Sequence, residues 1–143
     1  PRKGITRQEA VRRVLQGMTD DRAGYAALQT LLEEQFQATL HHQSTRLTAL
    51  ADQVVAAVEP LDARRRQRVS LVTALLGPQG DMPQLFALLQ EDARATAQRD
   101  WAALEQMVLE CKRLNARNSD LLTEQYSIMQ RVLHGEEDTY APG

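Results

Sequence analysis

The side chains that could do chemistry are few in this 143-residue chain, and their spacing assembles no reaction centre. His41 and His42 are neighbours, so on a helix they point about 100° apart, and no Asp, Glu or His one turn away completes a metal site. Cys111 lies on an apolar helical stripe, which is typical of a small buried hydrophobe. Phosphate loops, GxSxG elbows and HExxH motifs do not occur. We therefore predict no enzymatic activity, no cofactor and no metal.

The basic cluster consists of Arg64, Arg65, Arg66 and Arg68. It could steer an acidic partner by long-range attraction, but a solvated helix face explains it more simply, and we favour that interpretation. The formal net charge is −2 and the pI is about 5.9, so no chain-wide positive field would gather nucleic acid or anionic lipid. One cysteine, no long apolar run and no signal peptide predict a cytoplasmic protein without membrane insertion.

The elements that would position any site are helical, because Ala, Leu, Gln, Glu and Arg dominate while glycines and aromatics are few. Thr6 and Glu9 form a predicted capping box that begins a short N-terminal helix, with a bend or break near Asp20. Apolar residues then recur at helical spacing over residues 23–59 and predict one long amphipathic helix. Pro60 predicts a kink, after which the pattern resumes.

Residues 77–83 form the densest cluster of helix breakers and predict the bend where the chain reverses. A short amphipathic helix around Leu85 and Phe86 and a polar stretch at residues 90–99 follow. The last helix is predicted from Trp101 to His134, with residues 135–143 as a flexible tail. We thus expect a single all-α domain of elongated shape, built from two antiparallel helical arms at about 20–77 and 101–134.

The last predicted helix has an unusual apolar stripe. Its members at seven-residue spacing are Leu104, Cys111, Asn118, Gln125 and Val132. Polar residues at such positions either fix the register between helices or meet a partner that supplies hydrogen bonds, and both explanations remain open. Flanking apolar pairs at 107/108, 121/122 and 128/129 widen the face beyond the needs of one neighbour and favour a partner groove.

A family resemblance enters at the segment from Leu114 to Leu122, Leu-Asn-Ala-Arg-Asn-Ser-Asp-Leu-Leu, and at Thr-Tyr-Ala-Pro-Gly in residues 139–143. The order of a leucine-rich long helix, a central breaker, Asn-x-x-Asn and a tyrosine-containing end resembles the FlgN family of flagellar export chaperones. This resemblance implies a cytoplasmic chaperone that binds the C-terminal segments of hook-filament junction proteins and brings them to the export gate.

The resemblance also implies site residues. Those for cargo are Asn115, Asn118, Leu121 and Leu122, and Tyr140 is the one for docking on the cytoplasmic domain of the export gate. The stripe pattern adds Gln125, Ile128, Met129 and Val132 to the cargo set. A structural coiled-coil or adaptor protein of an unrelated pathway would show the same periodicity and remains the competing interpretation. The sequence sets no oligomeric state.

Overall fold

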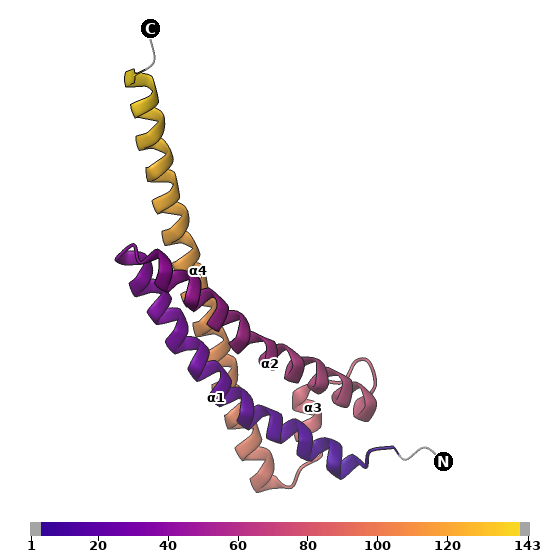
Figure 1. The fold of residues 1–143 in the computed structure, drawn as a ribbon. Helices are drawn as coiled ribbons and strands as arrows, with labels where there is room; N and C mark the ends of the chain where they lie inside the picture. Colours follow the sequence, from indigo (N-terminus) through magenta and orange to yellow (C-terminus); the bar gives the residue numbers. More distant parts are fainter. Residues whose placement is uncertain (1–3, 141–143) are drawn as a thin grey trace.

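Residues 4–140 form four helices, and the first of them stands at the centre of the arrangement (Figure 1). The computed structural model describes the backbone of residues 4–140 and the side chains of residues 4–135. The helices are α1 (Arg7–Leu40), α2 (Ser44–Leu76), α3 (Met82–Phe86) and α4 (Glu91–Tyr140), with no strand within residues 4–140. Because α1 packs along both α2 and α4, it joins the bundle together. The all-α class is confirmed.

The directions of the helices differ from the expected pair of antiparallel arms. α1 and α2 form an antiparallel hairpin, and α4 then runs parallel to α1. Along the α1–α4 contact the residue numbers of both helices therefore increase in the same direction, from Cys111 beside Tyr25 to Gln125 beside Thr39. The predicted arm at 20–77 is in fact two helices folded against each other.

α1 starts as predicted but does not bend near Asp20. The Thr6 Oγ1 accepts the Glu9 amide at 3.1 Å, while the Glu9 carboxylate binds Arg12 at 2.6 Å. The helix then continues to Leu40, so the separate short N-terminal helix was wrong. Asp21 does not cap a new helix, because its carboxylate is fully buried and used in tertiary ion pairs.

A turn at residues 41–43 interrupts what the apolar pattern predicted as one helix over residues 23–59. The turn contains no Gly or Pro, so the usual breaker signal is missing. His42 instead adopts the left-handed region with φ 53°, where His occurs more often than most non-glycine residues. The only sign of this turn in the sequence is that the six residues between Leu40 and Leu47 are all polar.

The next breakers lie within and at the end of α2. The helix continues through Pro60, where the kink stays a prediction, and it ends at Leu76 with Gly77 as its C-cap, whose φ of 86° suits glycine. Asp81 then caps α3 in a capping box with Gln84, which confirms the break predicted at residues 77–83. The chain leaves α3 after Phe86 and enters α4 at Glu91, so the predicted start of the last helix at Trp101 was wrong, and residues 91–99 of the polar stretch form its first turns.

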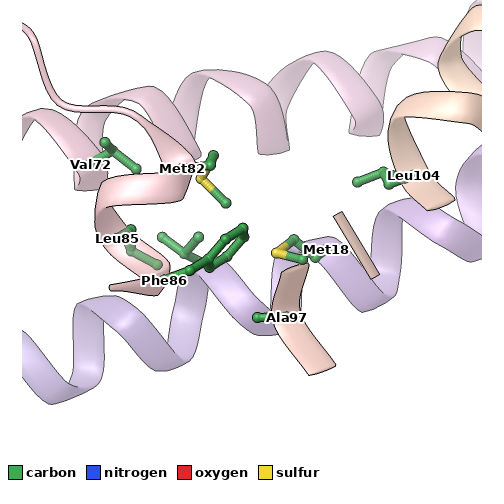
Figure 2. Close-up of a cluster of buried hydrophobic side chains, with 8 residues drawn as sticks. Met18, Val72, Met82, Leu85, Phe86, Ala97 and Leu104 are labelled. Atoms are coloured by element: carbon green, nitrogen blue, oxygen red, sulfur yellow. The ribbon is translucent and has the colours of Figure 1, made fainter. Parts of the chain in front are cut away.

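α3 packs between the three long helices, at the end of the bundle where α1 and α4 begin and α2 ends (Figure 2). Its Met82, Leu85 and Phe86 are buried among side chains of the three long helices. The partners from those helices are Val14, Met18, Val72, Ala97 and Leu104. Full burial of a side chain of this size stabilises the fold by roughly 1.5–3 kcal/mol. The contacts of α3 therefore hold the first turns of α4 in place.

α4 is much longer than the helices that cover it. Its 50 residues correspond to about 75 Å, and its last part projects alone beyond the α1–α2 turn (Figure 1). The helix passes Gly135 and reaches Tyr140, so the predicted end at His134 was wrong. Gly135 does not take the positive φ of a helix cap, which explains the continuation. Residues 141–143 of the predicted tail lie outside the described residues.

Candidate binding surface

The seam between α1 and α4 is held by polar side chains in a regular ladder. Cys111 Sγ lies 3.7 Å from Tyr25 O, Asn118 Nδ2 donates to Leu32 O at 2.8 Å, and Gln125 Nε2 donates to Thr39 O at 3.0 Å. Each pair is separated by 86 residues, so the register is constant over two heptads. Parallel helices that slid by one turn would lose all three contacts, and the ladder therefore fixes their register.

Asn118 belongs to this ladder and not to an exposed site. Only 1% of it is exposed, and its amide also donates to Gln35 Oε1 at 3.0 Å. Its oxygen accepts from Arg117, whose guanidinium stacks 3.7 Å from the Phe36 ring centroid. Of the two explanations for polar seam residues, register is the correct one for Asn118. A partner could reach this side chain only if α1 and α4 separated.

Cys111, one heptad below, is also a packing residue. It is 5% exposed, and burial raises the pKa of its thiol. A buried thiol with a raised pKa is a poor nucleophile, because little thiolate forms near neutral pH.

Above Gln125 the seam has no further helix to cover it, because α1 ends at Leu40. The exposed large apolar residues of this free end of α4 are Leu122, Tyr126, Ile128, Met129, Val132 and Leu133. Between 42% and 60% of each is exposed, which is unusual for six neighbouring apolar residues on one helix. The sequence predicted four of them and missed Tyr126 and Leu133, although their spacing from Leu122 and Met129 is helical.

The apolar residues of the free end form two adjoining faces. Leu121, Gln125, Ile128 and Val132 continue the line that α1 covers lower down, and we call them the seam face. Leu122, Tyr126, Met129 and Leu133 lie beside it, and we call them the side face. At 100° per residue the two faces together span about 160°, against roughly 100° for a stripe that packs on one neighbour. The free end can therefore bury more than one helix would cover.

A notch marks the place where the α1–α2 hairpin stops and α4 continues. It is an open cavity of about 750 Å³, with His42 of the turn on one side. The lining residues from α4 are Leu122, Thr123, Gln125, Tyr126, Ile128 and Met129. His42 holds a left-handed backbone conformation that costs a non-glycine residue of the order of 1–3 kcal/mol, and such strain often accompanies binding sites.

The remaining predicted site residues occupy the margins of this surface. Leu121 and Gln125 are half-buried at the base of the free end, and Asn115 is exposed lower on α4. The structure thus brings Leu121, Leu122, Gln125, Ile128, Met129 and Val132 together. Tyr140 is the last residue of α4, and its side chain lies outside the described residues.

The arginine cluster divides into two pairs: Arg65 and Arg66 lie on the expected solvated face, whereas Arg64 and Arg68 are structural, which corrects the expectation for those two. Arg64 and Arg68 bind the buried Asp21 carboxylate at 2.5 and 2.9 Å. Arg68 also lies 5.2 Å from the Trp101 ring centroid, so one side chain links α1, α2 and α4. Arg65 and its neighbour Arg66 both pair with Asp62 on the exposed side of α2.

Within the described part of the chain, no three His, Cys, Asp or Glu side chains gather as a metal group, and none of the four helices combines the length and hydropathy of a membrane span. What the molecule does present is a long helix with an uncovered apolar face. Such a face binds other polypeptides, above all amphipathic helices.

The molecule is an elongated helical bundle in which the end of one helix has no neighbour. The family model for the FlgN protein matches residues 10–134, and the chain belongs to the FlgN family. Searches of curated proteins and of solved structures found no match. The family is one of flagellar export chaperones, so the general role of this chain is that of a chaperone in flagellar protein export.

Proposed function

We propose that the chain is a cytoplasmic type III export chaperone for the C-terminal segments of hook-filament junction proteins. It keeps these segments from assembling prematurely and delivers them to the export gate. Family membership supports the general role. The finer statement is supported by the sequence motif at Leu114 to Leu122, which lies directly below the free end of α4.

The observation that carries this proposal is the apolar arc on the free end. Six large side chains are 42–60% exposed there, so a partner that covered them would bury about half of each and gain on the order of 1 kcal/mol per side chain. A junction-protein segment with an apolar helical face would itself tend to associate, and the arc masks such a face reversibly. No energy source at the site is needed, because release requires only a competing partner.

The proposed cargo contacts follow from accessibility. The six exposed residues form the main contact, and Leu121, Gln125 and Asn115 lie at its lower margin. Asn118 acts differently: it holds α1 and α4 in register and so positions the free end. The proposed binding residues on the free end therefore include Tyr126 and Leu133 as well as those expected from the stripe.

Tyr140 is proposed as the anchor for the export gate. It follows three acidic residues, Glu136, Glu137 and Asp138, in a stretch with no other large apolar side chain before Gly143. A single aromatic with charged neighbours is a common arrangement for a hot spot that fills a pocket on a partner. Cargo and gate would then be held at neighbouring parts of one helix.

A crossover experiment tests both assignments. Leu122→Asp combined with Met129→Asp places two charges on the side face, so we expect calorimetry to show at least a 100-fold loss of affinity for junction-protein C-terminal peptides. Gate binding should be unchanged. Tyr140→Ala should do the reverse, with a loss of roughly 2 kcal/mol or more for the gate's cytoplasmic domain.

The matched control is Val55→Asp with Leu88→Asp, since both residues are exposed apolar side chains away from the free end. It should leave both affinities at the wild-type level. A folded Leu122/Met129 variant with wild-type cargo affinity would contradict the cargo assignment, and unchanged gate affinity would do the same for Tyr140. An adaptor from an unrelated pathway would show no selectivity for junction-protein peptides over an unrelated amphipathic helix.

A further inference from the structure

α2 and α4 diverge on either side of α1 and leave a groove between them. Three open cavities of about 360, 360 and 470 Å³ follow one another along it. The first and second share Tyr25, Val108 and Lys112, and the second and third share Arg65, Arg68 and Trp101. The three cavities are therefore parts of one groove.

The walls and floor of this groove are mainly apolar. Leu28 and Leu32 of α1 lie at its floor, and Val58 on the α2 wall is 41% exposed. Val69, further along the same wall, is 55% exposed. These exposed valines leave apolar surface in contact with water, and a further helix could cover that surface.

The groove continues into the side face of the free end. Trp101, Val108, Asn115, Leu122 and Met129 are spaced by seven residues on α4 and so lie along one line of the helix. The first three line the groove, and the last two belong to the side face. One uninterrupted strip thus runs from the α2–α4 groove to the notch at His42.

We infer that the groove and the side face form one docking surface for a single long amphipathic helix of the cargo. This inference rests on the proposed function and extends its contact area. The line from Trp101 to Met129 covers 28 residues, or about 42 Å, so the cargo helix would be of similar length. The cargo helix would pack beside α4 in the same way as α1 packs at the seam. It would fill the space between α2 and α4.

The groove also favours a particular charge pattern on this helix. Lys112 stands on the α4 wall and Arg65 on the α2 wall, against Glu105 and Asp81 among the lining residues. Arg65 is already paired with Asp62, so Lys112 is the cation that the cargo can engage most directly. The fitting partner is an amphipathic helix whose flank facing α4 carries an acidic residue opposite Lys112 and a basic residue opposite Glu105.

The single tryptophan of the chain provides a direct test, because Trp101 lies in the groove and about 32 Å below Leu122 along α4. A tryptophan-free junction-protein C-terminal segment of about 40 residues would be titrated into the full chain. We expect the Trp101 emission to shift to the blue and acrylamide quenching to fall at least twofold at saturation. Saturated binding by calorimetry with unchanged Trp101 emission and quenching would overturn the inference and leave the proposed function standing.

A pair of valine variants gives an independent measurement. Val58→Glu places a charge in the groove, whereas Val55→Glu lies on the same helix, is 59% exposed and lines none of the three cavities. We expect at least tenfold weaker binding of the same segment for Val58→Glu and less than twofold change for Val55→Glu. Both variants should keep the wild-type melting temperature and circular dichroism.

The remaining outcomes are distinguishable. Equal affinity of the two valine variants would overturn the inference while the free-end variant still tests the function. If Val58→Glu alters the oligomeric state of the chain without changing cargo affinity, the groove belongs to a second copy and the inference is wrong. Loss of binding in the free-end variant together with the Trp101 shift in the wild type would support both.

Discussion

The packed half of α4, up to Asn118, and its free half, from Leu122 to Leu133, carry the same kind of apolar repeat in different surroundings. Leu104, Cys111 and Leu114 are at most 5% exposed, whereas Leu122, Met129 and Leu133 are 42–56% exposed. The difference is set by another element: α1 stops at Leu40 and α4 does not. Periodicity identifies the apolar face of a helix, but the length of its neighbour decides whether that face is core or binding surface.

The two halves also differ in polar content along the seam. In the packed half, Asn118 makes directional bonds to α1 that admit one register. In the free half, only Gln125 at its base still bonds to α1, and above it Ile128 and Val132 continue the seam face with apolar groups. An apolar surface without directional bonds accepts helices in more than one alignment.

The sharpest way to test this contrast is to truncate one leucine in each half. Leu114→Ala removes a fully buried side chain and should lower the free energy of unfolding by about 2–5 kcal/mol. Leu122→Ala should lower it by no more than about 1 kcal/mol, because 42% of that residue is already exposed. Urea denaturation followed by circular dichroism measures both. Equal losses would mean that the free half is covered in solution.

A smaller effect is expected from the two asparagines of the sequence motif. Asn118→Ala leaves Leu32 O and Gln35 without their amide partner and should cost about 1–3 kcal/mol of unfolding free energy. Asn115→Ala should stay within about 0.5 kcal/mol, since Asn115 is exposed. Cargo affinity of the folded Asn115 variant should fall only slightly. A stable Asn118 variant would show that the ladder does not fix the register.

The smallest perturbation compares thiols in the two halves. Cys111 is buried and its pKa is raised by burial, so its reaction with a maleimide at pH 7 should be slow. In a Cys111→Ala background, Ser127→Cys places a thiol on the exposed free half. We expect it to react at least about tenfold faster. Raising the pH should speed the reaction of both thiols, but the rate for Cys111 should keep rising beyond the ordinary thiol range, because burial shifts its pKa upward. Equal rates would indicate that α4 detaches readily from α1.

Much of the fold could be predicted from local signals. The helical composition, the breakers at residues 77–83 and the heptad stripe of α4 were sufficient for the class and for the existence of the last helix, although not for its two ends. Three exposed residues of the free end, Ile128, Met129 and Val132, also followed from the stripe, because an apolar face wider than one neighbour needs a second one. These features depend only on residues close together in the chain.

The errors came from contacts that no local pattern encodes. Asp21 looked like a helix cap, but Arg64 and Arg68 bind it from α2, more than forty residues away. The turn at His42 uses a left-handed residue that is neither Gly nor Asn. Asn118 looked available to a partner until α1 was placed beside it. For Asp21 and Asn118 the deciding partner lay on another helix.

The parallel seam has a consequence for how the chain acquires its structure. α1 meets α2 through a three-residue turn, but each of its ladder contacts with α4 joins residues 86 positions apart. Short loops close at lower entropic cost than long ones, so the α1–α2 hairpin should form first during synthesis and α4 should dock last. The flank of α1 that packs against α4, which includes Leu28 and Leu32, then stays without this cover until the final third of the chain has been synthesised. The helix that offers the binding surface is thus also the last to join the fold, and we expect hydrogen exchange to find it the first to leave.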